Sequence, residues 1–152
     1  MLTVLIRISI FVIQIKNMEK NNITLQETIG MVKTFHESFK IGNEETPIAA
    51  IAEKDYVLRH NLMAEENDEY LEAAKNGDLV EIADACGDML YILCGTLLKH
   101  GLQHKIEEVF REIQSSNMSK LDVDGNPIYR EDGKVMKSDQ YFKPNIKSIL
   151  EK

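Results

Sequence analysis

The apolar stretch from Leu79 to His100, which carries three carboxylates, constrains the fold more than any other feature. Glu81, Asp84 and Asp88 are spaced i, i+3 and i+7, which places them on one side of a helix. The remaining circumference is apolar, which is typical of a helix that is largely buried. Buried carboxylates are costly unless they are paired or bound to a metal, and this stretch has no basic residue before Lys99. The pattern therefore predicts a buried helix whose acidic side binds cations.

A second acidic side precedes this helix. Glu65, Glu66 and Glu69 lie on one side of a helix predicted to run from Pro47 to about Lys75. The short turn 76–78 predicts that the two helices are antiparallel, with Glu66 opposite Asp88. Five or six converging carboxylates suit hard cations, Mg²⁺ or Mn²⁺. A solvated acidic face would explain the first helix alone, but the second acidic side on an apolar helix favours metal binding.

The rest of the chain predicts an all-α fold, a four-helix core followed by a short C-terminal β-hairpin and tail. The pattern Thr24-Leu-Gln-Glu27 predicts a capping box before a helix that reaches about Lys40. A fourth amphipathic helix runs from about 106 to 115. Turn signals at 124–125 and 132–133 flank short runs that predict the hairpin. A last short helix is predicted over 144–150.

The composition limits the function. The chain has 152 residues, which predicts one main domain, and a formal net charge of -7. This acidic balance argues against a nucleic-acid or membrane surface. Cys86 and Cys94 lack metal-ligand spacing and predict free thiols in a reducing, cytoplasmic compartment.

Residues 1–17 differ sharply from the domain predicted over residues 18–152. They are almost continuously apolar, are interrupted by Arg7, and contain no acidic residue. The segment is shorter than a membrane span, and it lacks the basic start and small-residue cleavage site of a signal peptide. The three interpretations are a signal or anchor, an element packed on the domain, and an upstream extension. We expect a chain that starts at Met18 to fold and keep full activity.

The ordered combination of Glu65-Glu66-x-x-Glu69, a short gap and an acidic helix resembles the all-α nucleoside triphosphate pyrophosphohydrolase superfamily. This group includes MazG-like proteins, dimeric dUTPases and phosphoribosyl-ATP pyrophosphohydrolase. The tail motifs Ser116-Asn117-Met118-Ser119-Lys120 and Tyr141-Phe142-Lys143-Pro144 resemble its MazG-like members. The hallmark ExxD motif corresponds either to Glu81-Ile-Ala-Asp84 or to a pair that includes Asp88. Because Ala85 stands three residues before Asp88, the metal-binding pair stays open.

The resemblance implies Mg²⁺-dependent hydrolysis of nucleoside triphosphates to the monophosphate and pyrophosphate, with dUTP, dCTP or non-standard nucleotides as candidate substrates. It also implies a homodimer or homotetramer. The expected metal ligands are Glu66, Glu69, Asp84, Asp88 and Glu81, with Glu65 as the general base and Mg²⁺ (or Mn²⁺) as cofactor. Asn117, Lys120, Lys137 and Tyr91 are the candidate substrate-binding residues.

Two other functions fit the sequence. One is a non-enzymatic helical oligomerisation or regulatory module with a vestigial metal site. The other is a di-metal carboxylate redox protein, which the missing Glu-x-x-His spacing disfavours. The four histidines, His36, His60, His100 and His104, are expected at the surface or at helix ends.

Overall fold

The computed structural model describes residues 22–152, and within them the protein is all-α, as the sequence predicts. The helices are α2 (Leu25–Ser38), α3 (Glu53–Asn76), α4 (Leu79–Lys99), α5 (Ile106–Met118) and α6 (Ile146–Leu150). No helix in this part of the chain is long and apolar enough to cross a membrane. The apolar N-terminal segment 1–17 lies outside the described residues.

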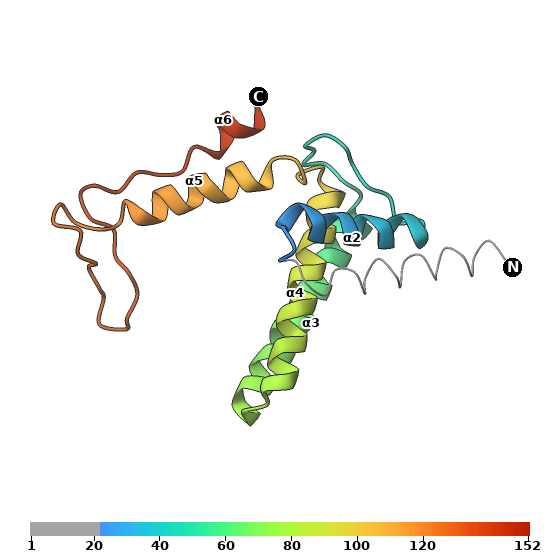
Figure 1. Cartoon of the computed structure of the whole chain (residues 1–152), viewed down its shortest axis with the longest axis horizontal. Coiled ribbons are helices and arrows are strands. Elements are labelled where there is room, and N and C mark those ends of the chain that lie inside the picture. The colour runs from blue at the N-terminus through green and yellow to red at the C-terminus, as the bar shows by residue number, and fades with distance from the viewer. Residues whose placement is uncertain (1–21) are drawn as a thin grey trace, which may run out of the picture.

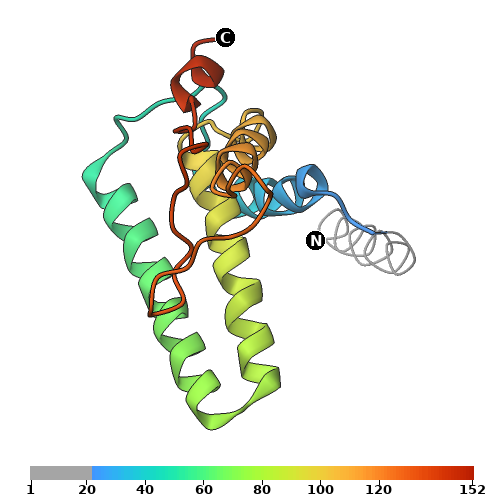
Figure 2. The same cartoon turned by 90° about the vertical axis from the view of Figure 1, so that its left-hand side faces the viewer.

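Helices α3 and α4 form a long antiparallel hairpin that projects from the rest of the molecule (Figure 2). Gly77 ends α3 in the left-handed conformation, with φ of +68°, which glycine adopts without steric cost. Asp78 then caps α4, because its carboxylate accepts hydrogen bonds from the backbone N–H groups of Val80 and Glu81. The predicted turn and its antiparallel consequence are therefore confirmed.

The core lies where α2 crosses the C-terminal half of α4 (Figure 1). The predicted capping box starts α2, since Thr24 and Glu27 each bond to the other's backbone N–H. The buried apolar cluster at this crossing comprises Ile29, Val32, Cys94, Leu97 and Leu98. Only the end of the α3–α4 hairpin away from the turn at Gly77 is therefore packed against the other helices, and we call it the anchored end.

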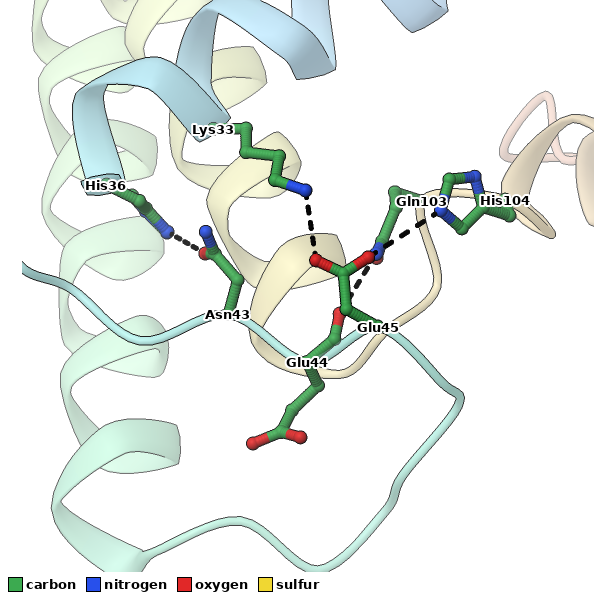
Figure 3. Close-up of polar contacts among 7 residues, drawn as sticks. All are labelled: Lys33, His36, Asn43, Glu44, Glu45, Gln103 and His104. Atoms are coloured by element: carbon green, nitrogen blue, oxygen red, sulfur yellow. Dashed lines mark hydrogen bonds and ion pairs between the residues drawn. The ribbon is translucent and has the colours of Figure 1, made fainter.

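The segment between α2 and α3 contradicts one expectation, because α3 begins at Glu53 and not at Pro47. The backbone N–H groups of Glu44 and Ile48 instead donate to the carbonyls of Leu98 and His100 at the end of α4. Gln103, which is buried, also donates from its side chain to the Glu44 carbonyl (Figure 3). These long-range bonds tie the segment to the end of α4, in place of the backbone bonds of a helix that starts at Pro47.

Helix α5 and the following segment extend away from the hairpin, and the chain then returns along α5 to α6 (Figure 1). The predicted C-terminal β-hairpin is not supported. Residues 119–145 contain one isolated antiparallel bridge, between Tyr129 and Val135, and no strand. The backbone N–H groups of Arg130 and Met136 donate to the carbonyls of Lys134 and Ile128, but Asp132 accepts from the Lys134 N–H, so the pairing does not extend into a ladder.

The expectation that α4 is largely buried is also wrong for the single chain. Leu79 and Val80 are 76% and 75% exposed, and Leu90 and Leu93 are also exposed. The physical reason is that α3 covers one side of α4, whereas α2 covers another side only near its C-terminal end. The apolar sides of the α3–α4 hairpin and of α5 thus remain uncovered in one chain.

Candidate functional site

The hairpin brings five of the six predicted carboxylates to one place. Glu66 is half-buried between α3 and α4, while Glu65, Glu69, Asp84 and Asp88 are exposed around it. We call these five residues the acidic cluster. The i, i+3 and i, i+4 spacing on each helix and the tight turn at 77–78 place them together.

The charges of the cluster act on one another. Burial raises the pKa of Glu66, and the negative charges of Glu69, Asp88, Glu65 and Asp84 raise it further. Glu81 is exposed and does not contribute to this shift, so it lies at the edge of the cluster. The effect of Asp88 on the pKa of Glu66 agrees with the register in which these two residues face each other across the helix pair.

The carboxylates are near one another but are not in ligating positions. Across residues 22–152 no group of three or more His, Cys, Asp or Glu side chains has a geometry that holds a metal ion. The donor set itself fits a hard cation, because it consists of carboxylate oxygens that repel one another without a compensating charge.

An aromatic patch borders the acidic cluster. Tyr91, one turn beyond Asp88 on α4, meets Phe35 of α2 edge-on, with 5.7 Å between ring centroids. The ring centroids of Phe35 and Phe39 are 4.4 Å apart. Burial raises the pKa of Tyr91, and the charge of Asp88 adds to the effect, which places the ring beside the cluster. All three rings are partly open to solvent, with Phe39 67% exposed.

The other predicted substrate residues gather at the far end of α5. Lys120 Nζ donates to Asn117 Oδ1 at 2.7 Å, and Lys137 Nζ lies 4.1 Å from the centroid of the Tyr141 ring. Burial raises the pKa of Tyr141, but polar contacts with Lys137 and Ser116 and the charges of both lysines lower it overall. We call Asn117, Lys120, Lys137 and Tyr141 the basic cluster.

The basic cluster and the acidic cluster are well separated within one chain. Figure 1 shows the end of α5 and the segment after it far to one side of the α3–α4 hairpin. The structure therefore brings Asn117, Lys120 and Lys137 together, but not beside the carboxylates. The sequence motif at 116–120 indicated Lys120, and Tyr141 begins the second tail motif, at 141–144, but it was not among the candidate substrate-binding residues.

The predictions from sequence also missed a set of polar residues near the end of the hairpin that packs against α2. His36 lies in the last turn of α2, which is one of the two positions expected for the histidines, but it is only 2% exposed, and its Nδ1 lies 2.6 Å from Asn43 Oδ1 (Figure 3). Nearby, Lys33 forms a 2.9 Å ion pair with Glu45. The spacing of His36 from Ile29 and Val32, the buried apolar residues of α2, places it on the buried side of that helix, a signal that the grouping of all four histidines overlooked.

A comparison with known protein families assigns the chain to one of them. The model of the family described as phosphoribosyl-ATP pyrophosphohydrolase matches residues 32–117, which is more than half of the chain. The chain belongs to the phosphoribosyl-ATP pyrophosphohydrolase family. A comparison with curated proteins finds no match to this chain.

Membership of the phosphoribosyl-ATP pyrophosphohydrolase family confirms the resemblance to the all-α pyrophosphohydrolase superfamily. It indicates an enzyme that hydrolyses a phosphoanhydride bond of a nucleotide. The matched range includes the whole acidic cluster, the aromatic patch and Asn117. Lys120, Lys137 and Tyr141 lie beyond it.

Proposed function

We propose that this protein is a Mg²⁺-dependent nucleoside triphosphate pyrophosphohydrolase that releases the nucleoside monophosphate and pyrophosphate. The observation that carries the proposal is the acidic cluster, in which α3 and α4 bring four carboxylates around the half-buried Glu66. Such a cluster repels a polyphosphate unless cations neutralise both partners. A family of nucleotide pyrophosphohydrolases that uses bound cations therefore suits these residues.

Glu66, Glu69, Asp84 and Asp88 are the proposed metal ligands, with Glu81 at the edge of the site. Bound Mg²⁺ would neutralise phosphate charge and lower the pKa of a coordinated water. Glu65 is exposed on the same side of α3, and we assign it the general-base role of accepting a proton at its carboxylate. The phosphoanhydride is thereby attacked by water, and pyrophosphate leaves.

The aromatic patch supports a nucleotide substrate over a simple polyphosphate. Tyr91 lies one helical turn from Asp88, Phe35 and Phe39 continue the patch from α2, and all three rings expose surface. Exposed aromatic rings bind bases of any sequence by stacking. We place the base on this patch and the phosphates over the acidic cluster.

Phosphoribosyl-ATP is the second candidate substrate, because the matching family bears its name. A panel of substrates separates the possibilities: the common ribonucleoside triphosphates, dUTP, dCTP, oxidised nucleotides and phosphoribosyl-ATP, each with Mg²⁺ or with EDTA. We expect pyrophosphate release from at least one nucleotide, and only with Mg²⁺. Metal binding with no hydrolysis of any panel member would instead favour the regulatory module.

The basic cluster takes part in this proposal through a second copy of the chain. Lys120 cannot contact a nucleotide held at the acidic cluster of its own chain, given the separation in Figure 1. The uncovered apolar residues on the hairpin and on α5, including Phe110 and Leu90, fit the expected homodimer or homotetramer. We propose that Asn117, Lys120 and Lys137 contact the phosphates bound by the partner copy.

Lys120→Ala is expected to raise KM for the best substrate by about tenfold, which corresponds to one lost charge-assisted contact, and to leave metal affinity unchanged. Steady-state kinetics and metal titration measure the two quantities. Mixing Lys120→Ala with Asp88→Asn should recover activity at low substrate concentration, because a mixed dimer contains one site with both residues intact. An unchanged KM would return Lys120 to the solvated surface, and no recovery on mixing would contradict the two-chain site.

A further inference from the structure

Arg59 occupies an unusual position on the same side of α3 as the acidic cluster. It lies seven residues before Glu66, two turns nearer the anchored end of the hairpin, and it is half-buried. No hydrogen bond or ion pair in the part of the chain that the structure describes engages its guanidinium. Within the same residues, the buried side-chain polar atom without a partner is Gln103 Oε1, so the Arg59 nitrogens keep access to solvent.

The α4 helix leaves room for this guanidinium at one glycine. Gly95 is buried, and a Cβ atom placed there would lie 2.8 Å from Arg59 Nη1 and 3.0 Å from His36 Nε2. Any side chain at position 95 would therefore displace the arginine head or the histidine ring. Gly95 also lies seven residues beyond Asp88, so Arg59 and Gly95 stand at the same height, about 10 Å from the acidic cluster along the helix axes.

His36 restricts the same head group from the α2 side. Its Nδ1 is bonded to Asn43 Oδ1, an acceptor, so Nδ1 carries the proton and Nε2 keeps its lone pair toward the Arg59 side. Burial lowers the pKa of His36, and although the hydrogen bond with Asn43 opposes this effect, the charges of Arg59 and Lys99 add to it, so the neutral ring is favoured. The neutral ring adds no competing charge beside the guanidinium.

The nearby anion is already engaged. Asp55 lies one turn before Arg59, but its carboxylate pairs with Lys99 at 3.4 Å. Burial lowers the pKa of the Arg59 guanidinium, and the charge of Asp55 only opposes this effect from a distance. A half-buried guanidinium without a direct partner is costly, and a planar fork of donors matches phosphate oxygens.

We propose that Arg59 is a further substrate-binding residue, which holds a phosphate group that lies beyond reach of the acidic cluster, and that His36 and Gly95 position it. This inference rests on the proposed function, since it assigns one end of a polyphosphate chain to the acidic cluster and the other to Arg59. A nucleotide polyphosphate is long enough to span the two positions.

Calorimetric titration with inorganic tripolyphosphate and Mg²⁺ tests the proposal without involving a base. Arg59→Gln is expected to weaken binding at least about tenfold, and Arg59→Lys, which keeps the charge but loses the fork, by less. Pyrophosphate is too short to reach Arg59 from the cluster, so its affinity should change little. Gly95→Ala should weaken tripolyphosphate binding as Arg59→Gln does, although it removes no charge.

Arg111→Gln is the matched control, because Arg111 is an exposed arginine on α5 that pairs with Glu107. It should bind tripolyphosphate as the parent does. His36→Phe should weaken binding in the parent but not in the Arg59→Gln background, a non-additivity that a purely structural role would not produce. Melting temperatures identify any variant that fails to fold, and Arg59→Lys then decides the outcome.

Unchanged tripolyphosphate affinity in folded Arg59→Gln would overturn the proposal. Equal losses for pyrophosphate and tripolyphosphate would also overturn it, since they would place Arg59 at the metal end. If the parent hydrolyses no nucleotide but binds tripolyphosphate through Arg59, the proposed function fails and this inference stands. If the parent hydrolyses a nucleotide and Arg59→Gln leaves KM unchanged, the proposed function stands and this inference fails.

Discussion

Asp88→Asn is expected to abolish hydrolysis and, at the same time, to make the metal-free protein more stable. The substitution keeps the shape of the side chain but removes one of the charges that raise the pKa of Glu66. Loss of one proposed metal ligand should lower kcat/KM by at least about a hundredfold. Relief of like-charge repulsion should raise the melting temperature in EDTA and reduce the shift that Mg²⁺ produces.

Asp68→Asn provides the matched control for this variant. Asp68 is an exposed aspartate on α3, and it does not contribute to the shift at Glu66. Asp68→Asn also removes one negative charge from the hairpin, but from outside the acidic cluster, so it should change neither the activity nor the response to metal. Thermal melts with and without Mg²⁺, together with a pyrophosphate-release assay, measure both effects. Hydrolysis by Asp88→Asn near the parent rate would show that the metal site lies elsewhere.

Magnesium is expected to stabilise the fold as well as to support catalysis. An ion that binds the folded state alone at a hundred times its Kd adds about 2.7 kcal/mol. For a domain of this size that corresponds to a rise of roughly 5–10 °C in melting temperature. EDTA should reverse the rise and stop hydrolysis. A melting temperature that does not respond to Mg²⁺ or Mn²⁺ would contradict a folded-state metal site.

The pH dependence of this effect has a defined sign. The folded-state pKa of Glu66 is raised, so the folded protein takes up a proton at a higher pH than the unfolded chain does. Ionised Glu66 therefore destabilises the metal-free fold at neutral pH, and this cost disappears as pH falls through the raised pKa. Glu66→Gln should melt above the parent in EDTA at pH 7, with a difference that shrinks at acidic pH.

The hairpin could be predicted because its signals are local. Asp78 as a cap, Gly77 as a left-handed helix end and the period of the carboxylates each follow from adjacent residues. The position of Glu66 opposite Asp88 then follows from counting residues on both sides of the turn. These arguments need no knowledge of the rest of the fold.

The errors arose where long-range contacts decide the outcome. Pro47 follows a threonine and looks like a helix start, but the neighbouring backbone is bonded to the end of α4. The depth at which His36 is buried also depends on residues distant in sequence, because Gly95 of α4 and Asn43 lie against its ring. The exposure of α4 in one chain likewise depends on which helices pack on it, which periodicity does not specify.

The proposed role of Arg59 could not be predicted from the sequence either. A single arginine in a helix rich in charged residues is ordinarily solvated, and nothing near it in sequence marks it. Its position depends on Gly95, 36 residues later, and on His36 from another helix. Only the packing of three helices shows that a glycine and a histidine shape the space around it.

Paramagnetic broadening by Mn²⁺ tests the central claim most directly, because it locates the ion on the protein. Side-chain carboxyl resonances are recorded by NMR as Mn²⁺ is added in small steps. The resonances of Glu66, Glu69, Asp84 and Asp88 should broaden first, and excess Mg²⁺ should restore them. Glu53 and Glu107, which lie on the anchored end of α3 and on α5, should keep their signals. Broadening that begins at Glu53 or Glu107, or equally at all carboxylates, would contradict a metal site on the acidic cluster.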